Sequence, residues 1–104
     1  FEKASMESTK VVPAIEGTAM APAFGHIFSG GYAAGYYGYK WAEVLAADGF
    51  SLFQQNGIFD SKTAAAFRKL LSSGGKVHPM DLYVEFRGHK PQTQALIDQM
   101  GLKK

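Results

Sequence analysis

Cysteine is absent from this 104-residue sequence, proline occurs only four times, and neither sign of charge forms a run. The lack of cysteine excludes a disulfide scaffold and thiolate metal sites and fits a reducing compartment, so we expect a cytoplasmic protein. The 11 basic and 9 acidic residues are scattered, which argues against nucleic acid or a membrane surface as a partner. No apolar run approaches a membrane span. This length supports one hydrophobic core, and therefore one domain or part of one.

Glycine and tyrosine are abundant, and they concentrate in residues 22–41. This stretch holds one histidine, four tyrosines and five glycines. Each glycine inside a helix costs about 1 kcal/mol relative to alanine, so local stability does not explain the composition. We therefore interpret residues 22–41 as the functional part of the chain.

The pattern after Ser29 predicts a long helix with two different faces. Ser29 is suited to be its N-cap, and the helix is expected to run from about Gly30 to the neighbourhood of Phe53, with Asp48 and Gly49 as the candidate break. An apolar stripe for packing on a core would consist of Tyr37, Trp41, Val44, Leu45 and Leu52. A strip of small residues, where another backbone could approach, would consist of Gly31, Gly35, Gly38, Ala42 and Ala46.

Three phenols would share a further face of this helix, because Tyr32, Tyr36 and Tyr39 occur at i, i+4 and i+7. Core aromatics with partnered hydroxyls are the ordinary explanation for such tyrosines. Here an apolar face already lies opposite them, and His26 stands at the entrance. Tyrosine is a protonated donor at neutral pH, and donors held on a rigid element suit the stabilisation of an oxyanion.

Three shorter helices are expected in the second half of the chain. Each has a starting signal and a stop that contains glycine. The first helix would begin at Asp60 or Ser61 and end at residues 72–75, the second would begin at Pro79 and end at Gly88, and the third would follow Pro91 and end at Gly101. No stretch alternates with a period of two residues. The predicted fold class is therefore all-α.

Residues 24–41 resemble the carboxyl-terminal signature of the thimet oligopeptidase and peptidyl-dipeptidase family of zinc metallopeptidases, and most of all its bacterial peptidyl-dipeptidase and oligopeptidase A branch. They follow the pattern Phe-x-His-Ile-Phe-x-Gly-Gly-Tyr-Ala-Ala-Gly-Tyr-Tyr-x-Tyr-x-Trp. The likeness continues through residues 67–68, 71–75, 79–83, 86–88, 91, 95–96 and 101–102. It implies that residues 1–104 are the carboxyl-terminal helical part of the catalytic domain of a larger, mostly helical zinc peptidase.

The resemblance also implies roles for individual residues when a zinc-bound water attacks a peptide carbonyl. His26, Tyr32 and Tyr39 would be catalytic, because they match the positions whose side chains donate to the carbonyl oxygen or the adjoining substrate backbone. The implied substrate-binding residues are Tyr36, Gly30 and Gly31, the glycines because they permit movement or close approach of the backbone. The segment before His26 departs from the family pattern.

The zinc-binding part of this family, a His-Glu-x-x-His helix with a further glutamate, does not occur in the chain. His26, His78 and His89 lack the spacing of a ligand pair, so no metal ligand is assigned here. The resemblance implies that zinc binds upstream in a longer polypeptide, and Phe1 is not an initiator residue. We expect the chain alone to be inactive, with a short peptide and its own upstream polypeptide as partners, and with self-association in isolation.

Two other interpretations are compatible with the residues. A small helical interaction module without catalysis would accept a partner helix on the strip of small residues and use the tyrosines as a contact surface. Tyrosines that stack on single-stranded nucleic acid are a weaker interpretation, because a basic groove is missing. A His-Glu-x-x-His motif in the upstream reading frame would favour the peptidase, whereas a gene that begins near Phe1 would favour the module.

Overall fold

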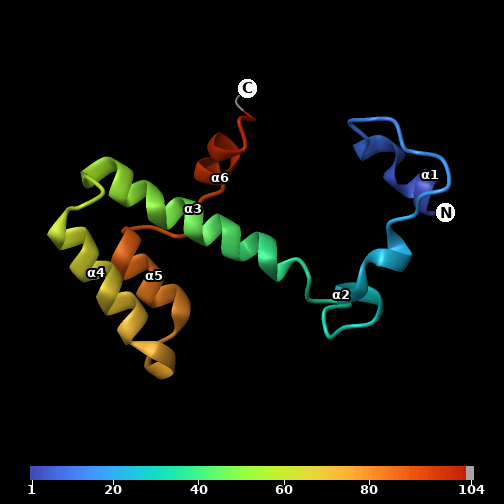
Figure 1. Cartoon of the computed structure of the whole chain (residues 1–104). Helices are drawn as coiled ribbons and strands as arrows, with labels where there is room; N and C mark the ends of the chain where they lie inside the picture. Colours follow the sequence, from blue (N-terminus) through green and yellow to red (C-terminus); the bar gives the residue numbers. More distant parts are fainter. Residues whose placement is uncertain (103–104) are drawn as a thin grey trace. The chain divides into compact units, whose positions relative to one another are not determined.

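The computed structural model describes residues 1–102, and those residues form helices and turns without any strand (Figure 1). This confirms the predicted all-α class. The chain divides into two compact units, which we call unit 1 (Phe1–Gly38) and unit 2, which begins at Tyr39. Within the described part of the chain, no helix is both long and apolar enough to cross a membrane.

Unit 1 consists of short helices and turns. Its elements are α1 (Glu2–Met6), the 3₁₀ turns η1 (Glu7–Thr9) and η2 (Ala21–Ala23), and α2 (Gly25–Phe28). The Glu2 carboxylate accepts hydrogen bonds from the backbone N–H groups of Met20 (2.6 Å) and Ala21 (3.1 Å), which joins α1 to η2. None of residues 1–38 is fully buried, so polar contacts and turns hold this unit together rather than a large core.

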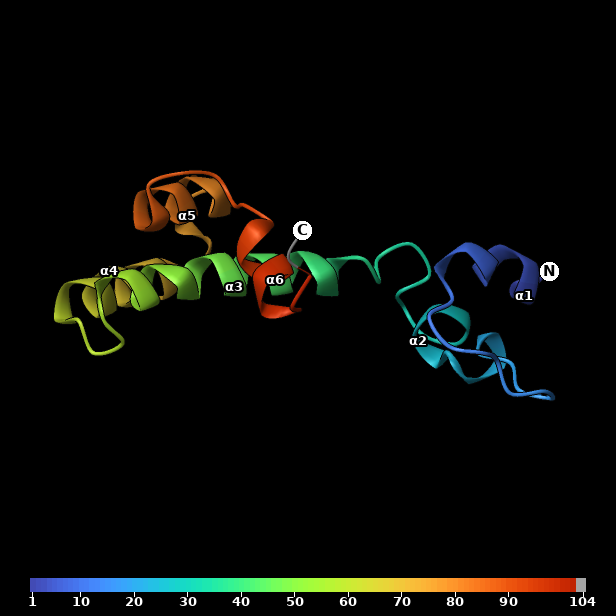
Figure 2. The ribbon, with the colours of Figure 1, turned by 90° about the horizontal axis from the view of Figure 1, so that it is seen from above.

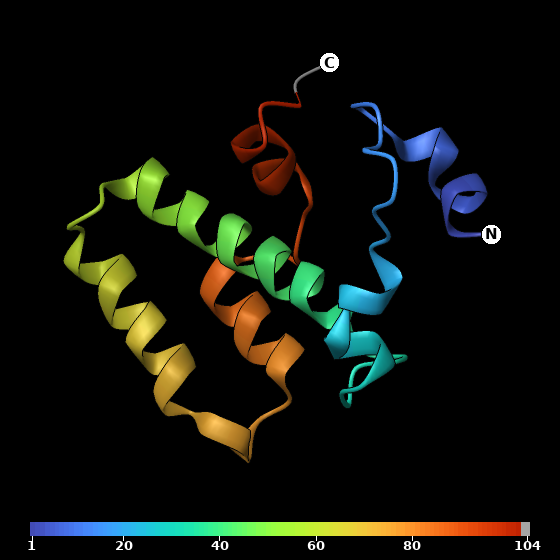
Figure 3. The same cartoon turned by 45° about the vertical axis from the view of Figure 1, so that its right-hand side comes forward.

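Unit 2 contains the long helix of the chain and the packed core. Its elements are α3 (Gly38–Asn56), α4 (Ser61–Ser72), the 3₁₀ turn η3 (Gly74–Lys76), α5 (Pro79–Arg87) and α6 (Gln94–Gln99). α5 packs on both α3 and α4, and α6 lies beside the middle of α3 (Figures 2 and 3). The buried apolar residues all belong to α3 and α5: Val44, Ala47, Leu82, Tyr83 and Phe86.

The starts and ends of α4 and α5 confirm the predictions from their capping signals, whereas α6 begins at Gln94 behind Thr93 and not directly after Pro91. Asp60 caps α4, and its carboxylate accepts hydrogen bonds from the backbone N–H of Thr63 (2.7 Å) and from the Thr63 hydroxyl (2.8 Å). These bonds lower the pKa of Asp60 below its ordinary value. α5 starts at Pro79 and ends at Gly88, whose φ of 85° lies in the left-handed region that favours glycine.

The predicted start of the long helix is wrong. α3 begins at Gly38, and Ser29 is not its N-cap but the residue that closes α2, where its N–H (2.8 Å) and hydroxyl (3.0 Å) both donate to the Gly25 carbonyl. The physical reason is the glycine content of residues 30–37. A helix through Gly30, Gly31 and Gly35 would lose about 1 kcal/mol at each of them, so turns form there instead.

This correction removes the strip of small residues as a helix face. Gly31 and Gly35 precede α3, so they cannot line up with Ala42 and Ala46. The interaction-module interpretation therefore loses the groove on which it depended. The apolar stripe is also only partly right, because Val44 is its one buried member.

The candidate break at Asp48 and Gly49 is also wrong. α3 continues through both residues, which are buried, and it ends at Asn56, three residues beyond Phe53. The helix ends where the N–H of Gly57 donates to the carbonyl of Phe53 at 2.8 Å and φ reaches 107°. Tertiary contacts of Asp48 and Gly49 with α5 override their weak helix propensity.

Candidate active site

Three of the predicted site residues form one ring cluster in unit 1. His26 lies on α2, and Tyr32 and Tyr36 follow in the turns between α2 and α3. The centroid of the His26 ring lies 5.9 Å from that of Tyr32 and 5.8 Å from that of Tyr36. The ring of Phe24 packs edge-on against Tyr36 at 4.6 Å, a favourable geometry for an aromatic pair. The cluster thus places an imidazole and two phenols together.

Backbone hydrogen bonds of the turn bring these rings together. The Tyr32 N–H donates to the His26 carbonyl at 3.2 Å, so the chain reverses directly after α2. The Tyr32 carbonyl then accepts from the N–H groups of Gly35 and Tyr36, each at 3.2 Å. Tyr32 and Tyr36 are therefore neighbours because of two consecutive turns and not because of a common helix face.

Gly30 is required where the chain crosses back over α2. A Cβ atom at this position would lie 3.0 Å from the His26 carbonyl oxygen and 3.3 Å from the Gly25 carbonyl oxygen. Both are backbone atoms, which cannot rotate away as a side chain could. A Cβ atom at Gly31 would meet nothing within 4 Å. The two glycines, which the resemblance treats alike, therefore differ in their steric freedom.

This difference gives a matched pair of variants. In the full-length gene product, Gly30→Ala should lower kcat/KM for a short peptide by about 10-fold to 10²-fold, because displacement of the His26 backbone misplaces the ring cluster. Gly31→Ala should lower kcat/KM less than Gly30→Ala does, because its Cβ atom would displace no atom of the chain. Steady-state kinetics on both variants tests this, and equal activity in the two would contradict the assigned role of Gly30.

A hollow of about 480 Å³ lies beside the cluster. It is lined by residues of α2 and the following turn, among them His26, Ser29, Gly30, Gly31 and Tyr32. Imidazole and phenol groups at its wall are hydrogen-bonding groups suited to the polar backbone of a peptide. Tyr39, the remaining predicted catalytic residue, is the second residue of α3 in unit 2, with 45% of its surface exposed.

The comparison with known proteins identifies the family. The model of the family described as Peptidase family M3 matches residues 2–102. The chain belongs to peptidase family M3. It is 51% identical over 94 residues to oligopeptidase A of Escherichia coli (strain K12), an alignment that covers 89% of this chain and 14% of the relative.

Two further relatives extend this comparison. A protein of Arabidopsis thaliana, named probable cytosolic oligopeptidase A, is 46% identical over 99 residues, or 90% of this chain and 14% of the relative. A dipeptidyl carboxypeptidase of Salmonella typhimurium is 35% identical over 104 residues, or 98% of this chain and 15% of the relative. The chain thus spans about a seventh of the length of these curated relatives.

The described residues of this M3 segment offer no zinc site of their own. Among residues 1–102, no group of three or more His, Cys, Asp or Glu side chains lies close enough together to hold a metal ion. His78 instead caps α5, where its Nδ1 accepts from the N–H of Met80 at 3.2 Å. No step of the reaction is therefore assigned to a metal bound by this segment.

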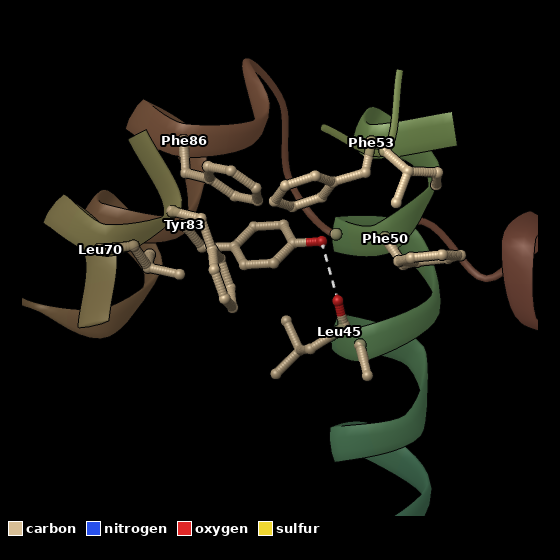
Figure 4. Close-up of a pocket in the computed structure, with 10 residues that line it drawn as sticks. Leu45, Phe50, Phe53, Leu70, Tyr83 and Phe86 are labelled. Atoms are coloured by element: carbon tan, nitrogen blue, oxygen red, sulfur yellow. Dashed lines mark hydrogen bonds between the residues drawn. The ribbon is translucent and has the colours of Figure 1, made fainter. Parts of the chain in front are cut away.

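A larger hollow of about 710 Å³ lies in unit 2, where α3, α4 and α5 meet. Its lining is almost entirely apolar, and Figure 4 shows the residues Leu45, Phe50, Phe53, Leu70, Tyr83 and Phe86 around it. The polar atoms drawn in this view are the Tyr83 hydroxyl and the Leu45 carbonyl oxygen, which lie 3.4 Å apart, whereas the shorter hydrogen bond of this hydroxyl, at 2.6 Å, is to Oδ2 of Asp48. An exposed apolar hollow of this size is typical of interaction surfaces and of ligand-binding grooves.

Sequence reasoning missed the polar cluster that joins α3 to α5 beside this hollow. Asp48 of α3 contacts Tyr83 and Arg87 of α5. Two signals could have revealed it. Asp48 follows the core residue Val44 by four positions, which places a carboxylate on a buried face, and Tyr83 and Arg87 are themselves four positions apart on one helix face.

Proposed function

We propose that this chain is the carboxyl-terminal part of the catalytic domain of a zinc-dependent M3 peptidase, an oligopeptidase or peptidyl-dipeptidase that hydrolyses short peptides. The ring cluster of His26, Tyr32 and Tyr36 beside the unit 1 hollow carries this proposal. The chain is 51% identical to an oligopeptidase A, and this similarity supports short peptides as the substrate class.

The proposed work of the chain is hydrogen bonding to the substrate. His26, Tyr32 and Tyr39 donate to the carbonyl oxygen on which negative charge develops, or to the adjoining substrate backbone. Tyr36 orients the peptide. Gly30 and Gly31 form the turn along which the peptide backbone passes. Donors of this kind accelerate the reaction because they bind the transition state more strongly than the substrate.

We place the zinc ion and its ligands in another part of the full-length polypeptide. The curated relatives are about seven times longer than this chain, which leaves ample sequence for a metal site. We propose that the same missing part covers the apolar hollow of unit 2. Phe50 supports this assignment, because it lines the hollow and leaves 45% of its surface exposed. We propose a cytoplasmic location, in line with the relative named as cytosolic.

The full-length gene product tests the proposed function directly. It should hydrolyse unstructured peptides, lose activity on treatment with a chelator and regain it with zinc. Mass spectrometry of the products separates release of carboxyl-terminal dipeptides from internal cleavage. A purified, folded full-length protein that cleaves no peptide in the presence of zinc would contradict the proposal.

A further inference from the structure

Asp48 is a carboxylate in the core of unit 2, with only 2% of its residue surface exposed. Its Oδ2 accepts a hydrogen bond of 2.6 Å from the Tyr83 hydroxyl, and its Oδ1 lies 3.5 Å from Nε of Arg87. Arg87 Nε also donates to the Asp48 carbonyl at 2.9 Å. Arg87 Nη2 donates to the Ser51 hydroxyl at 2.9 Å, and that hydroxyl donates to the Asp48 carbonyl at 2.7 Å.

Stability alone does not explain this cluster. The desolvation of a buried ion pair offsets most of its Coulombic attraction, and apolar residues of similar volume often serve a core as well or better. A hydrogen-bonded charge pair instead forms only in one relative orientation of the two helices that carry it. A slip of α3 by one residue would rotate the carboxylate by about 100° around the helix axis and separate it from both partners. The cluster therefore defines one rotation and one register of α3 against α5.

Directly beside Asp48 the surface of α3 is smooth, so the apolar packing at that point adds little to the definition of the register. The neighbours of Asp48 are Ala47 and Gly49, both buried. A Cβ atom at Gly49 would lie 3.7 Å from Cε1 of Phe86, so the phenylalanine ring rests against a helix backbone without a side chain between them. Such a contact resists sliding and rotation weakly, because it has no interlocking side chain.

We propose that Asp48, Tyr83 and Arg87 are positioning residues that set the rotation of α3 and, through it, the position of Tyr39. This inference rests on the proposed catalytic role of Tyr39, which lies nine positions before Asp48 on the same uninterrupted helix. Burial, and then the bond to Asp48, raise the pKa of Tyr83 well above its ordinary value. The Tyr83 hydroxyl therefore remains protonated, and a hydrogen-bond donor, at neutral pH.

Tyr83→Phe in the full-length gene product tests the proposal, because it removes one hydroxyl and keeps the ring. We expect kcat to fall by about 10-fold with KM within about twofold, since the misplaced donor acts in the transition state. Leu82→Ala is the matched control. Leu82 is equally buried on α5, but it lines a small hollow with residues of α4. It should lower the melting temperature at least as much and leave kcat unchanged.

Further variants test whether the effect of Tyr83→Phe on kcat acts through Tyr39. Tyr83→Phe should lower kcat much less in a Tyr39→Phe background than in the parent, because both changes then affect one donor. Equal effects in the two backgrounds would overturn the inference, as would normal kcat in Tyr83→Phe or a parallel loss in Leu82→Ala. If Tyr83→Phe does not fold, Ser51→Ala decides by the same split between kcat and KM. Normal kcat in Tyr39→Phe alone would instead refute the proposed role of Tyr39.

Discussion

Tyr39→Phe should lower kcat of the full-length peptidase by about 10² to 10³ and leave KM nearly unchanged, because one donor to the developing oxyanion is lost. A phenol that donates only in the transition state contributes little to binding of the ground state. Tyr32→Phe should have a similar or somewhat smaller effect, since its ring lies in the cluster with His26. Steady-state kinetics with a short fluorogenic peptide measures both constants.

Tyr37→Phe is the control for this experiment. It removes the same hydroxyl from a tyrosine two positions before Tyr39, 67% of whose surface is exposed and which has no proposed role. Its kcat should stay within about twofold of the parent. Near-normal kcat in both Tyr32→Phe and Tyr39→Phe would make these tyrosines ordinary structural aromatics, and a loss in all three variants would remove the assigned roles.

The isolated 104-residue chain should bind no stoichiometric zinc and hydrolyse no peptide, a complete loss relative to the full-length enzyme. It should be helical, of marginal stability and prone to self-association, because the apolar hollow of unit 2 and its rim are uncovered. Addition of the remaining polypeptide should increase its thermal stability and produce activity. Light scattering, thermal unfolding and a zinc assay measure these properties, and a stable monomer that cleaves peptides alone would contradict the prediction.

A pair of Phe→Asp variants tests whether the hollow is the covered surface. Phe50→Asp places a charge on the lining of the hollow, so it should prevent reassembly with the remaining polypeptide. Phe59→Asp makes the same change in the loop before α4, at a side chain with 98% relative exposure that does not line the hollow. It should reassemble as the parent does. Equal reassembly of both variants would exclude the hollow as the docking surface.

The parts of the fold that the sequence predicted correctly are those with local physical causes. α4 and α5 have capping or starting residues and stop signals within a few positions of their ends, and the structure has both helices at those places. A carboxylate such as that of Asp60 binds the first N–H groups of its helix whatever the rest of the chain does. A glycine such as Gly88 ends a helix for an equally local reason.

The parts that failed depend on contacts between distant residues or on a sum of small propensities. Asp48 and Gly49 have weak helix propensity, but their contacts with Tyr83 and Phe86 of α5 keep them helical. The spacing of residues within α3 does not predict those contacts. The start of α3 was misplaced because an i, i+4 spacing of tyrosines is compatible with turns as well as with a helix. Several glycines together made the turns more stable.

The sequence singled out the residues that form the ring cluster, but it did not predict how the chain brings them together. His26, Tyr32 and Tyr36 do lie together, yet a return of the chain over Gly30 joins them and not a shared helix face. The role of each residue, and the place of Tyr39 beside a substrate, stay predictions. The resemblance to a peptidase family indicates these positions but not the path of the chain between them.

Because α3 is one unbroken helix from Gly38 to Asn56, a small rotation at the buried cluster around Asp48 also moves the first turn of the helix. Tyr39 and Asp48 lie on one stiff rod, about 13.5 Å apart along its axis. A tilt of about 5° at the cluster would move the Tyr39 backbone by roughly 1 Å, a displacement that can reduce a rate by about 10²-fold. With Tyr39 in its proposed role, we therefore expect a change at Asp48 that is too small to alter the fold to be amplified at the hydroxyl that meets the substrate.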